Sequence, residues 1–360
     1  MNLYKLLVLI LFFWGSFIMT YYLTPVVIQV VKIKRLYEKL SDRSSHTVHV
    51  PSFGGVVFFV VFVMTLSFAE QFFLTFRAQY LIPAATIMFV VGLKDDMTGI
   101  SPRNKILAQI LATTILFLSP DFQITDLNGF LGLHQLSQWI VIPLAYAVVI
   151  FFINAYNLID GIDGLASSLG AFFFTAFAIL FYQLQDWGFL IVSTSMVGMF
   201  IAFLRYNLST DKKIFMGDTG SLFIGFILSA FVIVLMSSNY AVRIKHLAPS
   251  NFGILLIAIL FIPVFDSIRI FIARISEGRS PFSPDRNHIH HLIMDNYQLT
   301  HRQTTARILL LALCMPLVLW GLSYWLSHFW LVMAMLVKSI GLAFWLRSLR
   351  RKINARSLLS

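Results

Sequence analysis

Long apolar runs separated by short polar loops fill this chain of 360 residues. An unbroken apolar run of about 20 residues is long enough to cross a lipid bilayer as a helix. The pattern predicts eleven such helices; ten is the alternative, because the third and fourth are short and the last two also fit re-entrant segments. The predicted spans are residues 3–31, 53–75, 78–93, 104–119, 138–154, 164–184, 187–206, 219–237, 250–275, 305–325 and 327–347.

The composition excludes an ordinary soluble globular protein. Charged residues make up 12% of the chain and hydrophobic residues 58%, whereas average soluble domains contain about 25% charged residues. The first apolar run is too long for a signal-peptide core and lacks a small-residue cleavage site, so we expect it to remain as the first span. No repeat or linker divides the chain. We therefore expect one all-α, polytopic membrane domain over residues 1–360.

Positively charged residues concentrate in alternate loops, which predicts the topology. The net charge is +11, but it is spread over many short loops rather than along one stripe, so we expect no nucleic-acid partner. Lys and Arg are frequent in residues 32–52 and 276–304 and in the C-terminal tail, whereas residues 120–137 contain none. Arg77, Arg243 and Lys245 oppose the trend. The positive-inside rule then predicts a periplasmic N-terminus and a cytoplasmic C-terminus.

This topology places all the polar clusters on one side of the membrane. The clusters at residues 94–105, 154–163, 205–221 and 276–302 all fall on the predicted cytoplasmic face. A transporter would be expected to place ionisable groups near the middle of the membrane or on both faces. The distribution favours an enzyme that acts on a cytosolic substrate at the inner leaflet, with an ion-coupled transporter as the alternative from another class.

Two amides and two carboxylates follow the fifth predicted span at steps of three residues. They are Asn154, Asn157, Asp160 and Asp163. On one unbroken helix these side chains would spread over about half of the circumference. We therefore expect Gly161 and Gly164 to break the helix and to let the two carboxylates turn back toward one centre. Oxygen ligands of this kind suit Mg²⁺. Helix capping is the alternative, and it explains only one of the carboxylates.

Adjacent carboxylates, Asp95 and Asp96, end the third predicted span. Their repulsion raises one apparent pKa unless a cation compensates, which indicates metal or proton handling; a solvated loop pair is the alternative. Lys105 and Gln109 follow four residues apart and therefore share one helix face. Lys105 is placed to hold a lipid phosphate, or else only extends its ammonium to the interface.

Asp218 introduces the eighth predicted span between two glycines, in Gly217-Asp218-Thr219-Gly220. Glycines let the backbone approach a ligand closely, and the N–H groups at the start of the following helix favour phosphate. Helix capping is the alternative. Asp266 lies inside the ninth predicted span, three residues before Arg269. This acid is either functional or half of a structural ion pair.

The last cluster contains an arginine and three histidines. These are Arg286, His288, His290 and His291. A spacing of two residues without cysteines is a poor match to common zinc sites. Arg and His donors on a loop suit a diphosphate better. A solvated loop is the alternative.

Together and in this order, these clusters resemble the polyprenyl-phosphate N-acetylhexosamine-1-phosphate transferase family, glycosyltransferase family 4. The match covers about residues 40–300, and it includes Arg43 and His46 at the family's spacing, although the loop between them lacks the usual lysine. The sequence His-Ile-His-His is the pattern of the N-acetylglucosamine branch. The resemblance implies ten or eleven spans in the bacterial inner membrane, with the active site facing the cytoplasm.

The resemblance also implies a reaction. In this family the phosphate of undecaprenyl phosphate attacks the β-phosphorus of UDP-N-acetylglucosamine, which releases UMP and starts a lipid-linked O-antigen or other cell-envelope polysaccharide. Another UDP-N-acetylhexosamine is the alternative donor. Such a transfer depends on positioning and charge neutralisation, for which Mg²⁺, or Mn²⁺ in its place, is the implied cofactor. The sequence does not show which polymer is made from the product, whether the reaction passes through a covalent intermediate, or whether the protein forms a homo-oligomer.

The family motifs imply a role for each singled-out residue. Asp218 and Asn157 would be metal ligands; Asp95, Asp96, Asp160 and Asp163 would be catalytic acids; and Lys105, Asn154, Asp266, Arg286, His288, His290 and His291 would bind substrate.

Overall fold

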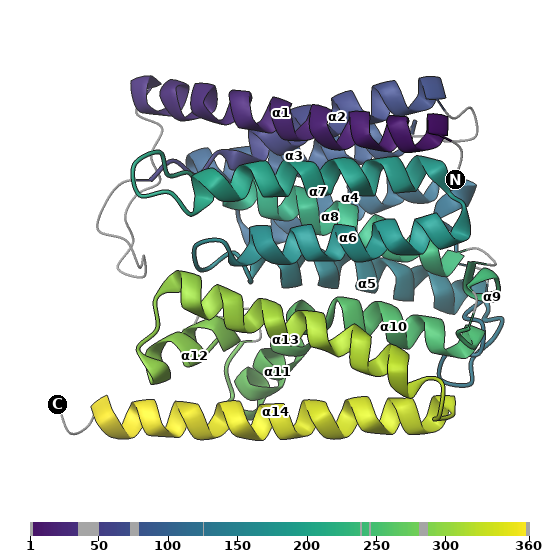
Figure 1. The fold of residues 1–360 in the computed structure, drawn as a ribbon. Helices are drawn as coiled ribbons and strands as arrows, with labels where there is room; N and C mark the ends of the chain where they lie inside the picture. The colour runs from purple at the N-terminus through teal and green to yellow at the C-terminus, as the bar shows by residue number, and fades with distance from the viewer. Residues whose placement is uncertain are drawn as a thin grey trace.

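The computed structural model describes residues 3–34, 50–72, 79–124, 126–237, 240–244, 246–280 and 287–357. Within these residues the regular structure is helical, apart from one isolated bridge between Phe130 and Leu133. The long helices lie side by side in a bundle (Figure 1). They and the short helices are α1 (Leu3–Lys34), α2 (Gly54–Phe72), α3 (Leu81–Thr98), α4 (Pro102–Phe117), η1 (Pro120–Phe122), α5 (Gln138–Asn157), α6 (Leu165–Leu184), α7 (Trp187–Asn207), α8 (Gly217–Ser237), α9 (Tyr240–Arg243), η2 (Pro249–Asn251), α10 (Phe252–Ile259), α11 (Phe261–Ser276), α12 (Ile289–Tyr297), α13 (His301–Leu322) and α14 (His328–Ser357).

The helices make this a multi-pass membrane protein. In the described part of the chain, eight helices are long and apolar enough to cross a membrane, or nine if α10 and α11, which are bent by 77°, form one broken span. The third and fourth predicted spans are helices α3 and α4, of 18 and 16 residues. These two do not meet the length and hydropathy expected of a full span. The all-helical membrane fold is therefore confirmed, while the count of eleven spans stays a prediction.

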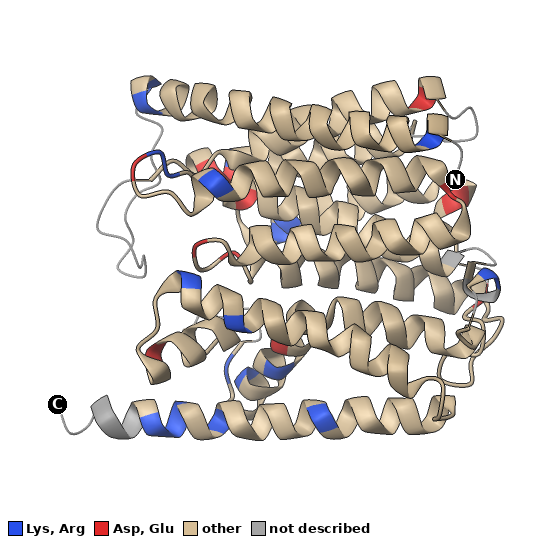
Figure 2. Ribbon diagram, in the orientation of Figure 1, with Lys and Arg blue, Asp and Glu red and all other residues tan. Residues whose placement is uncertain are grey.

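Charged residues gather toward one end of the bundle. The start of α1 and the end of α14 lie at opposite ends (Figure 1). Most Lys, Arg, Asp and Glu residues lie toward the end that carries α12 and the connections after α5 and α7, whereas the middle of the bundle has few of them (Figure 2). This is the end at which the sequence clusters come together.

Local signals fix where two of the helices near this end begin. The Ser101 hydroxyl accepts a hydrogen bond from the Asn104 N–H, and Pro102 follows in the first turn of α4, where its missing N–H costs nothing. Thr300 and Gln303 form a reciprocal capping box at the start of α13. These caps fix the orientation of the first side chains of each helix.

Helix α8 is the centre of the bundle. Within its most apolar stretch 94% of the residues are buried, against 11% for α14. Helices α3 and α5 both pack along it. Further along α8, the ring of Phe231 contacts the rings of Phe174, Phe177, Phe181 and Phe189. The N-terminus of α8 therefore projects toward the charged end from the most firmly packed element of the structure.

Candidate active site

The segment before α8 is fixed by backbone contacts with residues just ahead of α2. The Phe215 N–H donates to the Pro51 carbonyl at 2.7 Å, and the Phe215 carbonyl accepts from the Gly54 N–H at 3.0 Å. Gly217 has a φ of +71°, and a Cβ there would lie 1.9 Å from the Ser52 carbonyl oxygen. Only glycine fits this left-handed turn, so Gly217 determines how α8 begins.

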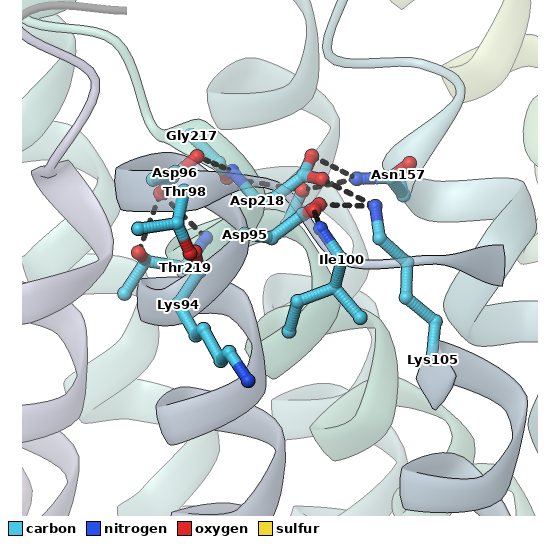
Figure 3. A network of polar contacts seen from close by, with 11 residues as sticks. Lys94, Asp95, Asp96, Thr98, Ile100, Lys105, Asn157, Gly217, Asp218 and Thr219 are labelled. Atoms are coloured by element: carbon cyan, nitrogen blue, oxygen red, sulfur yellow. Dashed lines mark hydrogen bonds and ion pairs between the residues drawn. The ribbon is translucent and has the colours of Figure 1, made fainter. Parts of the chain in front are cut away.

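Side chains from four helices converge at this point, as Figure 3 shows. Asp218 of α8 accepts hydrogen bonds from Lys105 Nζ of α4 at 2.8 Å and from Asn157 Nδ2 of α5 at 2.7 Å. Lys105 also forms an ion pair with Asp95 of α3. Asn157 donates a second hydrogen bond, to the Ser221 hydroxyl. Three of the sequence clusters, at residues 94–105, 154–163 and 205–221, therefore contribute to one site.

Asp95 and Asp96 have different surroundings despite being neighbours in sequence. Asp96 accepts hydrogen bonds from the backbone N–H groups of Asp218 at 2.8 Å and Thr219 at 2.9 Å, and from the Thr219 hydroxyl. Asp95 faces Lys105 and accepts from the Ile100 N–H at 2.7 Å. The alternative of a solvated loop pair is wrong, because both carboxylates are engaged by other parts of the chain.

Asn154 lies one turn before Asn157 on α5. It donates to Gln109 Oε1 at 3.0 Å and to the Ile150 carbonyl at 2.7 Å. Gln109 is fully buried. Lys105 and Gln109 thus face the same side of α4, as their spacing predicts, but Asn154 connects α5 to α4 rather than to Asp218.

Asp163 belongs to a second cluster, which differs from the expectation of one common centre. Helix α5 ends at Asn157 and α6 begins after Gly164, whose φ is +77°, so the chain breaks where predicted. Asp163 Oδ2 then pairs with Lys213 Nζ at 2.6 Å and His301 Nδ1 at 3.1 Å. Burial opposes its ionisation, but the hydrogen bonds from His301 and Lys213 outweigh burial and lower the pKa of Asp163.

Asp160 lies on the same turn, next to Gly161. Its side chain is half-buried, and its N–H donates to the Asn157 carbonyl at 3.3 Å. Gly161 in turn contacts His290, because a Cβ on Gly161 would lie 2.4 Å from His290 Nε2. The histidine from α12 therefore fits only against a glycine, and this contact connects the Asp160 turn with the histidine cluster.

His290 is a buried neutral imidazole. Its exposed fraction is 1%, and within the described residues neither ring nitrogen has a hydrogen-bond partner. Burial lowers the pKa of His290 well below its ordinary value, and the nearby His291 and His288 lower it further. The ring centroids of His290 and His291 lie 4.3 Å apart. The predicted histidine loop is instead the start of helix α12.

Asp266 fixes the start of that helix. It accepts hydrogen bonds from Arg269 at 2.6 Å and from the Ile289 N–H at 3.1 Å, and it pairs with His288 Nδ1 at 2.9 Å. Arg269 also donates to the Asn287 carbonyl. The alternative of a structural ion pair fits Asp266 in this geometry, since its carboxylate orients His288. Arg286, Arg43 and His46 lie outside the described residues.

The donor set at Asp218 fits a magnesium ion that is shared with a substrate. Among the described residues, no group of three His, Cys, Asp or Glu side chains is placed to hold a metal alone. Mg²⁺ commonly uses one or two carboxylates together with substrate phosphates and water. Asp95 and Asp218 supply two carboxylates that already attract one cation, Lys105. Asn157 presents its nitrogen to Asp218, so its amide would have to turn over before its oxygen could bind a metal.

Four residues that the sequence patterns did not single out also contribute. Lys213 and His301 hold Asp163, and the Thr305 hydroxyl donates to the Asp163 carbonyl at 2.9 Å. The Asn207 side-chain oxygen accepts a hydrogen bond from the Gly164 N–H at 2.8 Å. These partners are up to 142 residues apart in sequence, so no local spacing could reveal them.

The sequence of this chain is similar to those of known proteins. The sequence profile described as "Glycosyl transferase family 4" matches residues 78–236, which contain the Asp95, Asn157 and Asp218 clusters. The undecaprenyl-phosphate alpha-N-acetylglucosaminyl 1-phosphate transferase of Yersinia pestis is 32% identical, over 79% of this chain and 76% of its own length. A probable undecaprenyl-phosphate N-acetylglucosaminyl 1-phosphate transferase of Bacillus subtilis is 31% identical, over 85% and 84%. A decaprenyl-phosphate N-acetylglucosaminephosphotransferase of Mycobacterium tuberculosis is 30% identical, over 70% and 67%.

Proposed function

Because the chain belongs to glycosyl transferase family 4, we propose that it transfers N-acetylglucosamine-1-phosphate from UDP-N-acetylglucosamine to undecaprenyl phosphate and releases UMP. The observation that carries this proposal is the convergence of Asp95, Lys105, Asn157 and Asp218 from four helices. Carboxylates, an ammonium and an amide at one point suit a reaction between two phosphate groups, which needs charge neutralisation more than a protein nucleophile. Another UDP-N-acetylhexosamine is the alternative donor.

In the proposed mechanism each side chain binds or orients a phosphate. Asp218 and Asp95 would hold a Mg²⁺ ion, and such an ion would supply charge neutralisation for the diphosphate. Asp95 is better placed than Asp96 to orient the acceptor phosphate, since Asp96 is fully engaged with α8. His288 would donate a hydrogen bond to a phosphate oxygen, and Lys105 would do the same when its ammonium faces the substrate.

An apolar groove supports a polyprenyl acceptor. It lies between α10–α11 and α14, encloses about 430 Å³, and is lined by apolar side chains such as Ile254, Phe261, Met335 and Ala343. Arg269 also lines the groove, and its guanidinium bonds to Asp266, which holds the His288 side of the site. An isoprenoid chain in this groove would therefore lie beside Arg269, which connects through Asp266 to His288.

In the proposed orientation the protein lies in the inner membrane of a bacterium and the site faces the cytoplasm. Many of the Lys and Arg residues that Figure 2 shows lie at the charged end of the bundle, the end that the positive-inside rule assigns to the cytoplasm. The N-terminus would then be periplasmic. The lipid-linked product would start the synthesis of O-antigen or of another cell-envelope polysaccharide.

The proposal is tested by incubating membranes that contain the protein with radiolabelled UDP-N-acetylglucosamine, undecaprenyl phosphate and Mg²⁺. We expect labelled lipid and UMP, and the mass of the lipid identifies both the sugar and the polyprenol. Asp218→Ala should abolish the transfer, whereas Asp211→Ala, at an exposed position, should not. The absence of labelled lipid with every UDP-N-acetylhexosamine would overturn the proposal, and solute counterflow in proteoliposomes would favour an ion-coupled transporter instead.

A further inference from the structure

Lys105 occupies the position between two carboxylates. Its ammonium pairs with Asp95 on one side and lies 2.8 Å from Asp218 Oδ2 on the other. The side chain of Lys105 is 24% exposed, and those of Asp95 and Asp218 are 10% and 31% exposed. The chain therefore supplies its own cation at the point where the proposed function requires a metal.

A divalent ion bound to the same carboxylates would compete directly with Lys105. Two cations at adjacent positions repel each other strongly where water is partly excluded. The other oxygen of Asp218 accepts a hydrogen bond from Asn157, so this carboxylate cannot turn toward a metal without losing a contact. Metal binding and the Lys105 ion pairs therefore oppose each other in the free protein.

We propose that Lys105 is the resident counter-cation of the metal site and is displaced when a divalent metal binds. This inference rests on the proposed function and specifies how its metal site works. The displaced ammonium would then face the substrate phosphates, whose negative charge can accommodate both cations. Free protein accordingly binds the metal weakly, and a metal–diphosphate complex binds well because it brings the anions that Lys105 needs.

The first test is a titration of the purified full-length protein with Mn²⁺, without nucleotide or lipid, in which free Mn²⁺ is measured by electron paramagnetic resonance. Lys105→Met should bind Mn²⁺ about tenfold more tightly than the unchanged protein, because one competing positive charge is removed. Lys105→Arg keeps that charge, so its Mn²⁺ affinity should stay as low as that of the unchanged protein. The matched control is Lys94→Met. Lys94 is exposed and points away from the carboxylates in Figure 3, so its loss should change the affinity little.

The second test keeps the chain unchanged and so does not depend on the folding of a variant. The amine of Lys105 is acylated under limiting reagent and quantified against Lys94 by mass spectrometry. Addition of saturating Mn²⁺ should raise the Lys105 signal severalfold, since metal releases the amine from its two ion pairs. A Lys105→Met protein that binds Mn²⁺ no more tightly, or an acylation rate that Mn²⁺ leaves unchanged, would overturn the exchange.

These outcomes separate the inference from the function on which it rests. Mg²⁺-dependent sugar transfer together with an unchanged Lys105 acylation rate overturns the exchange and leaves the transferase function standing. Failure of transfer with every UDP-N-acetylhexosamine overturns the function, whatever the Mn²⁺ affinity of the variants.

Discussion

Asp96 on α3 caps the first turn of α8 through Thr219, whose backbone N–H and hydroxyl both donate to Asp96 Oδ2. Helix N-termini carry unpaired N–H groups and a partial positive charge, which a carboxylate satisfies. The cap here comes from another helix and fixes the backbone of Asp218 as well. Asp96 therefore positions the site, whereas its neighbour Asp95 faces into it.

We expect Asp96→Ala to destabilise the protein by about 1–2 kcal/mol, because a helix cap is lost. The apparent melting temperature in detergent measures this effect, and sugar transfer should fall with it. Thr219→Val should cost less, since only the hydroxyl contact is lost. Adding Thr219→Val to Asp96→Ala should change little, because the two groups share one contact. Equal melting temperatures for Asp96→Ala and the unchanged protein would contradict the capping role.

Gly161→Ala should displace His290. The added methyl group would lie 2.4 Å from His290 Nε2, so the imidazole or the Asp160 turn must move. We expect sugar transfer to fall at least about tenfold, as a small displacement of a binding group commonly has such an effect. In a His290→Ala background the clash is absent, and Gly161→Ala should then have little further effect. Full additivity of the two substitutions would show that the contact is unimportant.

Lys213 and Lys212 form a matched pair for testing the second cluster. Lys213 pairs with Asp163 at 2.6 Å, whereas Lys212 is exposed. Lys213→Met should destabilise the protein by about 1–3 kcal/mol, because it leaves a half-buried carboxylate with fewer partners. Lys212→Met should leave the melting temperature nearly unchanged, which controls for the lost positive charge. Similar effects of the two substitutions would contradict a specific role for the Asp163 cluster.

His290 predicts a loss of stability in mild acid. Its folded-state pKa is well below the ordinary value of 6.5, so below that pH the unfolded chain binds a proton that the folded chain excludes. The contribution of His290 to stability should then fall by up to about 1.4 kcal/mol per pH unit as the pH drops below this value. Asp163 adds nothing between pH 7.5 and pH 5, because its ordinary pKa of 3.8 and its lowered folded-state pKa keep the carboxylate ionised in both the unfolded and the folded chain.

The measurement is the difference in apparent melting temperature between pH 7.5 and pH 5. His290→Gln should reduce this difference, because the substituted side chain does not titrate. His134→Gln, at an exposed position, should leave it unchanged. If both variants behaved alike, His290 would not be the group responsible.

The sequence predicts some parts of this site and cannot predict others, for physical reasons. Asp95, Asn157 and Asp218 each stand at the end of an apolar run on the same predicted face, so a shared site could be foreseen. Asp96 contacts the start of α8 and Asp95 contacts Lys105. Which of the two faces α8 depends on how α3 is rotated against α8, and the sequence does not show this rotation. The partners of Asp163 are equally hidden: Lys213 and His301 lie 50 and 138 residues away in the chain, and only tertiary packing brings them together.

The contrast in burial between α8 and α14 has a mechanical consequence. Changes in bilayer thickness and lateral pressure act most on helices that face lipid, such as α14, whose most apolar stretch is only 11% buried. They act least on α8, whose most apolar stretch is 94% buried. Asp218 lies on the buried helix α8, whereas the acceptor groove is lined in part by the lipid-facing helix α14. Lipid composition should therefore affect the arrival of the acceptor more than the geometry of the phosphate transfer.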